Sequence, residues 1–296
     1  MQNKDHLLAL EAPAKINLYL CVTGRRADGY HLLDSLVTFT KLGDRLIAEP
    51  ADRLTLRIEG PFSGNLKGCE EDNIVLRAAR ALQGAFGIRE GATVTLEKNL
   101  PISSGIGGGS ADAAAALRIL TKLWRIKTND AELSRIGLLI GADIPVCIAG
   151  VTCHMSGMGE TVLPADPLPT CGIVIVNGAE AVSTPAVFAG RKGPYTTCMA
   201  WEAPINFDEF VSQLQLLAND LMDSARTVSP LIADVLGELK KAEGCALARM
   251  SGSGGTCFGL FADQSGAEKA AGDIRNANPQ WWSMATTFRT KRPKIC

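Results

Sequence analysis

Hydrophobic and polar residues alternate along the first part of the chain in the pattern of half-buried β-strands. Within residues 15–20 every second side chain is apolar, beginning at Ile16, whereas Lys15 and Asn17 fall on the opposite face. When a Lys and an Asn lie side by side on one face of a strand, that face is either exposed to solvent or lines a cleft. The same pattern predicts further strands at residues 36–40, 45–48, 54–58 and 92–97.

Other stretches carry apolar residues at helical spacing and begin at polar capping residues. Residues 72–73 would start a helix that runs through residue 82, with Asn73 as its N-cap. A second helix would run from Ser110 to about Arg125. A third, from 130 to about 140, would end at a glycine, which suits the position after a helix.

The pattern changes between residues 150 and 170, where a Gly- and Met-rich segment is typical of a hairpin. We expect the boundary between two domains there, with domains at 1–160 and 161–296. The basic tail, 289–294, is interpreted as a solvated end. The elements predicted for the second half are a strand at 172–176, a helix from 184, helices at 207–224 and 230–242, a strand–turn–strand at 246–261, a helix near 265–276 and a strand around 281–285.

A glycine-rich loop leads from the strand at 92–97 into the helix that starts at Ser110. Four of the five residues 105–109 are glycine. Such a loop directs unpaired backbone N–H groups, and the positive end of the helix dipole, at one place. This arrangement favours binding of a phosphate group. The alternative is a turn that only reverses the chain.

Two common phosphate loops do not match this stretch. A P-loop requires Lys and then Ser or Thr after its last glycine, but Gly109 is followed by Ser110 and Ala111. The dinucleotide fingerprint G-x-G-x-x-G would begin at Gly105, but its sixth position is a serine. Asp130 stands about 20 residues further on, as that fingerprint asks, yet its place at a helix start indicates a cap. A dehydrogenase is therefore disfavoured.

Four residues whose side chains could take part in binding or catalysis have ordinary interpretations when they are taken alone. Asp143 follows the end of a predicted helix and precedes apolar residues, where the pKa of a carboxyl can shift. Most such residues are simply loop aspartates. The Tyr30-His31 pair, which follows an Asp-Gly turn, and Phe188 are most simply structural.

Three stretches in order resemble the motifs of the GHMP kinases, small-molecule kinases whose phosphate loop is unrelated to the P-loop. They are Ala-Pro-Ala-Lys-Ile-Asn-Leu at 12–18, Gly-Ile-Gly-Gly-Gly-Ser-Ala-Asp at 105–112 and the Gly-rich strand–turn–strand at 246–261. Gly-Ala-Asp-Ile-Pro-Val at 141–146 matches the family at its catalytic Asp. The resemblance covers nearly the whole chain. It implies an α+β fold: an N-terminal α/β domain with a left-handed βαβ element, a C-terminal ferredoxin-like domain, and an active site between them, with the third motif close to the phosphate loop.

The resemblance also implies roles for individual residues. Lys15 and Asp143 would be catalytic. The ATP-binding residues would be Asn73, Pro101, Ser104, Gly105, Ile106, Gly107, Gly108, Gly109 and Ser110. The residues that bind the phosphoryl acceptor would be Asn17, Tyr30, His31, Asp143 and Phe188.

The acceptor that the resemblance implies is a methylerythritol linked to cytidine diphosphate, from the non-mevalonate route to isoprenoids. Tyr30 and Phe188 would stack on the cytosine, and His31 would offer its edge one donor and one acceptor. Mg²⁺ is expected with ATP because the phosphates need a hard cation. Its protein ligand is not evident, since Ala111 replaces a serine that is frequent in the family.

Composition narrows the alternatives further. The 296 residues are 46% hydrophobic and carry a net charge of −1, so nothing indicates a nucleic-acid or membrane partner. Nine scattered cysteines with no C-x-x-C pair indicate reduced thiols in the cytoplasm. A monomer and a weak homodimer both remain open.

Two alternative functions stay in view. Another GHMP kinase, acting on an alcohol such as mevalonate or homoserine, is disfavoured by Tyr30, His31 and Phe188. A non-catalytic nucleotide-binding regulator is disfavoured because Lys15 and Asp143 are both retained.

Overall fold

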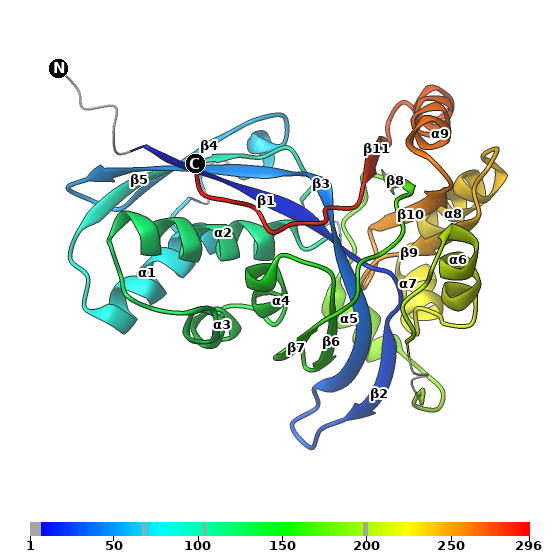
Figure 1. The fold of residues 1–296 in the computed structure, drawn as a ribbon, viewed down its shortest axis with the longest axis horizontal. Helices are drawn as coiled ribbons and strands as arrows, with labels where there is room; N and C mark the ends of the chain where they lie inside the picture. Colours follow the sequence, from blue (N-terminus) through cyan, green and yellow to red (C-terminus); the bar gives the residue numbers. More distant parts are fainter. Residues whose placement is uncertain (1–6, 67, 69, 103–104, 198–200) are drawn as a thin grey trace.

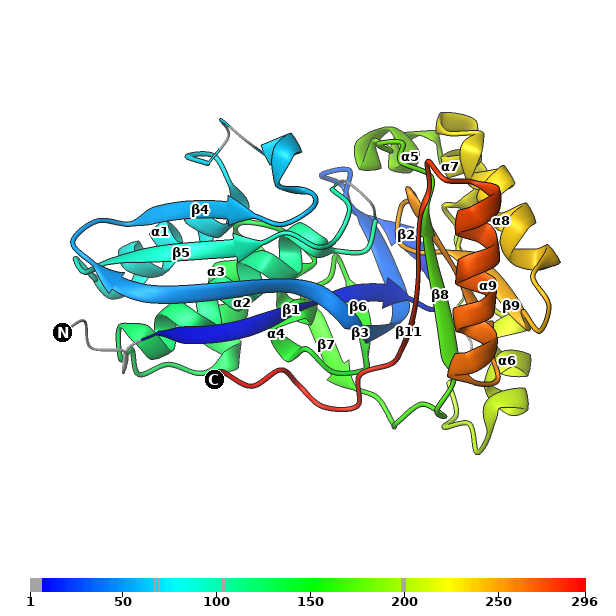
Figure 2. The same cartoon turned by 90° about the horizontal axis from the view of Figure 1, so that it is seen from above.

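The computed structural model describes residues 7–66, 68, 70–102, 105–197 and 201–296. Within these residues two β-sheets divide the chain into a first and a second unit (Figures 1 and 2). The elements of the first unit are β1 (Leu8–Asn17), β2 (Cys21–Arg25), β3 (His31–Ala51), β4 (Thr55–Glu59), a short 3₁₀ helix (Ser63–Leu66), α1 (Ile74–Phe86), β5 (Gly91–Glu97), α2 (Gly108–Leu123), α3 (Asp130–Leu138), α4 (Ile144–Ala149), β6 (Cys153–Gly157) and β7 (Thr161–Pro164).

Strand β3 is the centre of the first sheet, because β1, β2, β5 and β6 all pair with it. The sequence predicted separate strands at 36–40 and 45–48, but β3 is continuous through Gly43. A side chain there would place its Cβ 2.5 Å from the carbonyl oxygen of Ala12. The register of β1 shifts just after Pro13, opposite this glycine. Gly43 therefore marks the place where β1 and β3 approach each other closely, and not the end of a strand.

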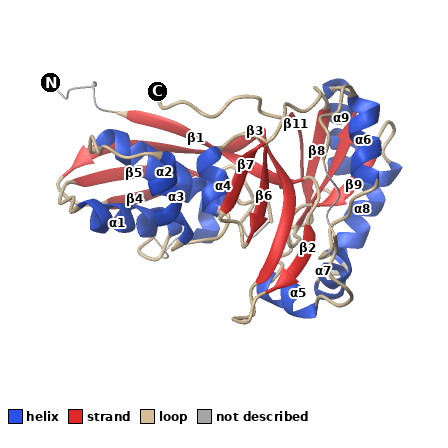
Figure 3. Ribbon diagram, turned by 60° about the horizontal axis from the view of Figure 1, so that its bottom comes forward, coloured by secondary structure: helices blue, strands red, loops and turns tan. Residues whose placement is uncertain are grey.

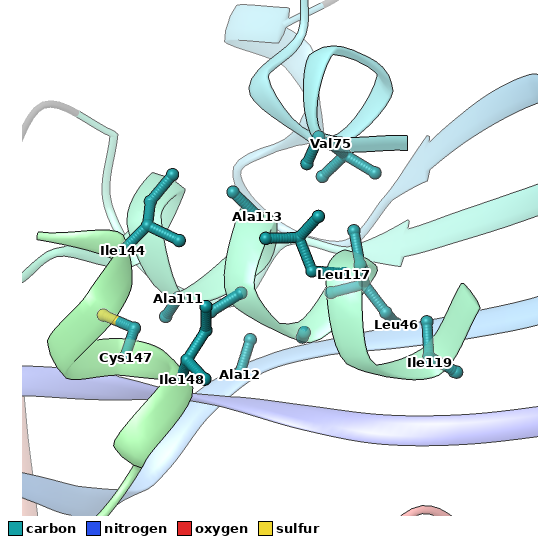
Figure 4. Close-up of a cluster of buried hydrophobic side chains, with 14 of the residues drawn as sticks. Ala12, Leu46, Val75, Ala111, Ala113, Leu117, Ile119, Ile144, Cys147 and Ile148 are labelled. Carbon is teal, nitrogen blue, oxygen red and sulfur yellow. The ribbon is translucent and has the colours of Figure 1, made fainter. Parts of the chain in front are cut away.

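Helices α1 to α4 pack on one face of the first sheet, below the strands in Figure 1. Strands β4 and β5 are parallel neighbours joined through α1, which gives the expected βαβ unit. Small side chains at 113–116 let α2 lie close to the sheet and to α1, and Figure 4 shows Ala113 and Leu117 beside Val75. Asn73 caps α1 as predicted, because its Oδ1 accepts a hydrogen bond from the amide of Val75 at 2.9 Å.

The second unit has the ferredoxin-like arrangement that the resemblance implied. Its sheet has the order β11-β8-β10-β9, and all its neighbours are antiparallel. The elements are β8 (Gly172–Asn177), α5 (Thr184–Gly190), α6 (Phe207–Gln215), α7 (Met222–Val228), α8 (Leu231–Lys241), β9 (Leu247–Met250), β10 (Thr256–Phe261), α9 (Gln264–Ala277) and β11 (Trp282–Thr287).

Strand β8 is buried on both faces, and its alternating side chains belong to two different cores. Val174 and Val176 pack with residues of α8 and α9. Ile173 and Ile175 belong to a cluster that also contains Ile16 of β1. The two units therefore share a hydrophobic core, which fixes the cleft between them.

Two local predictions were wrong, and one short helix was not predicted. The helix predicted at 207–224 is divided into α6 and α7, and the intervening chain forms a bridge between Leu20 and Asn219. Residues 144–149, with no predicted element, form the short helix α4. The cap of α3 is Asn129, whose Oδ1 accepts from the amide of Glu132, and not Asp130.

The C-terminal tail is not the solvated end that was expected. After β11 it returns along the first unit (Figure 2), and Cys296 and Ala9 exchange two backbone hydrogen bonds, at 2.9 and 3.0 Å. Arg292 forms an ion pair with Asp130.

The boundary between the units was expected at residues 160–161. Strand β7 ends at Pro164 and pairs with β6, so it belongs to the sheet of the first unit. We therefore propose that the boundary lies within 165–171.

Candidate active site

A cleft of about 1250 Å³ lies between the two units and is lined by both. Among the described residues, one predicted site residue, Ile106, does not line it. Ile106 is buried, although its carbonyl oxygen accepts a hydrogen bond from the amide of Lys15 at 2.9 Å, and Ser104 lies outside the described residues. The predicted residues that line the cleft are Lys15, Asn17, Tyr30, His31, Asn73, Pro101, Gly105, Gly107, Gly108, Gly109, Ser110, Asp143 and Phe188.

Lys15 and Asp143 form an ion pair inside this cleft. Their Nζ and Oδ2 atoms are 3.1 Å apart, and the side chain of Lys15 is 3% exposed whereas that of Asp143 is 39% exposed. Lys15 also donates to Oδ1 of Asn17 at 2.8 Å. Gly107 leaves room for the lysine, since a Cβ there would lie 3.0 Å from its Cε. The pair thus combines a fixed, buried cation with a carboxylate that substrate can reach.

Asn17 is held from three sides. Its Nδ2 donates to the hydroxyl of Ser35 at 2.8 Å, and its backbone amide donates to the hydroxyl of Ser251 at 3.1 Å. Ser35 in turn donates to the carbonyl oxygen of Tyr19 at 2.5 Å. These bonds orient the amide so that its oxygen faces Lys15, which fixes the position of the ammonium group.

The glycine loop before α2 is packed against the glycine turn between β9 and β10. Gly105 has φ +74°, and a Cβ on it would lie 2.0 Å from the carbonyl oxygen of Gly254. A Cβ on Gly252 would lie 2.8 Å from the carbonyl oxygen of Gly105. The second and third motifs, about 150 residues apart in sequence, are therefore in contact, as the resemblance implied.

This contact predicts a strong effect of Gly105→Ala. The methyl group would meet backbone that cannot move aside, and the left-handed conformation adds strain. We expect the free energy of unfolding to fall by about 1–3 kcal/mol and KM for ATP to rise at least about tenfold, measured by denaturant unfolding and steady-state kinetics. Gly84→Ala is the control, because a Cβ on that helical residue meets nothing within 4 Å. Wild-type values for Gly105→Ala would contradict the packing.

A buried charge cluster that no local sequence pattern indicates lies behind the glycine loop. Lys98 donates to Asp44 at 2.5 Å and to Asp112 at 2.7 Å, and all three side chains are almost fully buried. Asp44 also accepts from the amides of Asn99 and Leu100, at 2.6 and 2.8 Å. A bonded lysine and aspartate so far apart in sequence give no local signal. The cluster holds the chain that enters the loop.

Burial and mutual charge shift the pKa of two members of this cluster. Burial raises the pKa of the Asp112 carboxyl to about 8, against the attraction of Lys98 and with the help of Asp44. Burial alone would lower the pKa of Lys98, but the two carboxyls raise it. The raised pKa of Asp112 means that this carboxyl holds its proton more readily than an ordinary aspartate, which reduces the repulsion between the two buried carboxyls.

The far end of the cleft is aromatic and lies beside α5, where Figure 3 shows the ends of β2 and β3. The rings of His31 and Phe188 are 5.3 Å apart with a 30° tilt, and Tyr30 is 63% exposed. Burial, and then the charges of Arg25 and Arg191, lower the pKa of His31. At neutral pH the imidazole is uncharged, so it keeps one donor and one acceptor nitrogen.

Two further residues that the sequence did not single out support the third motif. Asn219 donates to the carbonyl oxygens of Met250 and Gly252, both at 2.9 Å. The buried Arg249 donates to the carbonyl oxygens of Leu18, Leu214 and Leu217, each at 2.7 Å. Both residues act through contacts with distant parts of the chain. These contacts connect the glycine turn to the end of β1, where Lys15 and Asn17 lie.

The sequence matches models of one protein family in both units of the chain. Residues 73–151 match the GHMP kinases N terminal domain, and residues 206–280 match the GHMP kinases C terminal region. The chain belongs to the GHMP kinase family, whose members are ATP-dependent kinases of small molecules. None of the described helices is long and apolar enough to cross a bilayer.

Within this family the chain is similar to enzymes of one name, 4-diphosphocytidyl-2-C-methyl-D-erythritol kinase. The Rhodospirillum rubrum protein is 47% identical over 275 residues, which cover 93% of this chain and 90% of that protein. The Parvibaculum lavamentivorans protein is 49% identical, covering 92% and 94%. A crystal structure of 4-(cytidine 5'-diphospho)-2C-methyl-D-erythritol kinase has a TM-score of 0.76 at 31% identity, covering 96% of this chain and 100% of that one.

Proposed function

We propose that this protein transfers the γ-phosphoryl group of ATP to a hydroxyl of 4-diphosphocytidyl-2-C-methyl-D-erythritol and forms the 2-phosphate, in the non-mevalonate route to isoprenoid precursors. The similarity to relatives of that name over nearly the whole chain supports the substrate. The single structural observation that supports the chemistry is the Lys15–Asp143 ion pair in the cleft, beside the glycine loop.

Phosphoryl transfer requires alignment and charge stabilisation more than covalent chemistry. In our proposal the backbone amides of residues 105–110 hold the ATP phosphates at the start of α2. Asp143 accepts the proton of the acceptor hydroxyl, which aligns that oxygen with the γ-phosphorus. Lys15 pairs with Asp143 and stabilises the charge on the moving phosphoryl group. Asn17 positions the acceptor beside the lysine.

The aromatic end of the cleft would hold the cytosine. Tyr30 and Phe188 present ring faces, and His31 presents a donor and an acceptor to the base edge. Each stacked ring contributes about 1–3 kcal/mol in comparable nucleic-acid sites. On the nucleotide side, Asn73 at the start of α1 and Pro101 line the part of the cleft assigned to ATP.

Mg²⁺ is part of the proposal because it neutralises the ATP phosphates when bound. The side chains that face the cleft fit a weakly held ion: Asp143 offers one accessible carboxylate, and position 111 has no hydroxyl. The described residues contain no cluster of three or more His, Cys, Asp or Glu side chains that would hold a metal. The ion would therefore depend on the phosphates for most of its ligands.

The partners and location are proposed from the same observations. The substrate is a small molecule, and the enzyme acts in the cytoplasm as a monomer or weak homodimer. Five cysteines of the described chain are buried free thiols, which suits a reducing compartment. Neither the net charge of −1 nor the cleft favours a nucleic-acid partner.

The experiment that tests the function is ADP release by the purified protein with Mg-ATP. The acceptor is present in one arm and is replaced by mevalonate, homoserine or galactose in the others. We expect release only with the cytidine-linked acceptor. Release with a control alcohol would keep the kinase and overturn the assignment of Tyr30, His31 and Phe188. No release with any acceptor, despite ATP binding, would overturn the catalytic proposal.

The pH dependence of acceptor binding tests the role of His31. The pKa of His31 lies below its usual value near 6.5. As the pH falls through that pKa, the imidazole gains a proton and loses its acceptor, so KM for the acceptor should rise on the acid side. Arg25→Gln should raise the pKa of His31 and move this rise to higher pH, as measured by kinetics and by NMR titration of the histidines. A KM that does not change from pH 5 to 8 in either protein would contradict the role.

A further inference from the structure

A second hollow, of about 530 Å³, lies on the first unit at the opposite end of α2 from the glycine loop. The last turns of α2, the connection to α3 and the C-terminal tail enclose it. Nothing in the proposed reaction uses it. Its lining includes basic side chains from three separate parts of the chain, together with apolar side chains from the connection, α3 and the tail.

The charges around this hollow are unbalanced. Four basic residues line it against one acidic residue, Asp130, and the guanidinium of Arg292 already binds both oxygens of that carboxylate at 2.5 and 3.0 Å. In the described chain no acidic side chain forms an ion pair with any of the other three, which are Arg118, Lys122 and Arg125. The hollow therefore carries about three unneutralised positive charges in a protein whose net charge is −1.

A helix C-terminus by itself favours basic residues, which accounts for Lys122 and Arg125 at the end of α2. It does not account for Arg118, which stands more than a turn earlier and is partly buried. Arg118 donates to the carbonyl oxygen of Pro293 at 2.9 Å. Burial, and then the charge of Arg292, lower the pKa of Arg118 to about 10. Two guanidinium groups are thus held near each other at a cost that a bound anion would relieve.

We propose that this hollow binds a multiply charged, phosphate-type anion at a site separate from the active site. Lys122 and Arg125 are exposed and give the anion access, and Arg118 has further guanidinium N–H groups that suit phosphate oxygens. Arg292, whose two terminal nitrogens already hold Asp130, adds positive charge to the wall of the hollow. Because Arg292 belongs to the C-terminal tail, the bound anion connects that tail to α2. Binding should therefore stabilise the folded protein.

The test uses inorganic pyrophosphate as the probe. The wild-type protein is first saturated with Mg²⁺ and a non-hydrolysable ATP analogue, so that the phosphate loop is occupied. Calorimetric titration should then show one further pyrophosphate bound per chain, and the thermal unfolding midpoint should rise. In the Lys122→Gln/Arg125→Gln double variant, both side chains being exposed, we expect the affinity to fall at least about tenfold while KM for ATP is unchanged.

Lys127→Gln is the matched control. It removes an exposed charge from the same connection, but Lys127 does not line the hollow, so pyrophosphate should bind as in the wild type. Three outcomes overturn the proposal: no pyrophosphate binding to the analogue-saturated protein, equal binding to the double variant, or an equal rise in unfolding midpoint with sodium chloride at the same ionic strength. The last would mean charge screening rather than a site.

Discussion

Asp143→Asn is expected to lower kcat by about three orders of magnitude, within the range that a general base contributes. The amide keeps the shape of the side chain but cannot take the proton of the acceptor hydroxyl, and it no longer neutralises the buried ammonium of Lys15. The glycine loop does not depend on this side chain. The dissociation constant for ATP should therefore stay within about threefold of the wild-type value. Single-turnover kinetics and equilibrium ATP titration measure the two effects separately.

The control for this variant is Asp72→Asn, which removes a carboxylate from the same cleft at the start of α1 rather than beside Lys15. We expect it to keep kcat within a few-fold. If Asp143→Asn retained more than a tenth of the wild-type kcat, Asp143 would be a residue that only orients the acceptor. Equal losses in the two variants would point to the overall charge of the cleft instead.

Much of the site could be predicted from local sequence because local geometry decides it. Strand periodicity placed Lys15 and Asn17 on one face of β1, and both line the cleft. The Asn73 cap depends on neighbouring residues only, and the glycine loop leads directly into α2 as the local pattern predicted. Roles within the cleft came from the resemblance and stay predictions until they are measured.

The features that escaped prediction are those decided by distant contacts. Gly43 is typical of a strand end, but here it allows β1 to cross β3 closely. Asn219 looks like an ordinary helix residue, but its bonds to Met250 and Gly252 divide the expected helix and support the third motif. Lys98 meets Asp44, 54 positions earlier in the chain, in the interior. No pattern within a window of 15 residues contains such pairings.

These distant contacts have one consequence for function: the site exists only when both units are in place. The phosphate loop of the first unit packs on the glycine turn of the second, and Ser251 bonds to the backbone of Asn17. The catalytic pair is therefore aligned by a contact between the units. Lys15, which belongs to this site, and Lys98, which lies in the buried cluster, are about equally buried but have different partners. Loss of the charge should therefore affect activity at Lys15 and stability at Lys98.

Lys15→Met is expected to lower kcat by about 100- to 1,000-fold, the usual effect of removing one group that stabilises developing charge. Its effect on folding should be the smaller of the two, because Asp143 is 39% exposed and can be hydrated, so the main cost is the hydrogen bond that the buried Asn17 loses. Lys98→Met is the comparison. It would leave the fully buried Asp44 without its ion-pair partner, so we expect a loss of about 3–5 kcal/mol in the free energy of unfolding.

Chemical denaturation and steady-state kinetics on both variants separate the two roles. The expected result is an active-site defect with a modest loss of stability for Lys15→Met, and a larger loss of stability for Lys98→Met. Lys15→Arg keeps the charge but has a forked head group that does not match the single position between Asn17 and Asp143, so it should restore little activity. A Lys15→Met protein that unfolds as readily as Lys98→Met would show that the Lys15–Asp143 pair is structural. Near-normal kcat in Lys15→Met would remove the lysine from the mechanism.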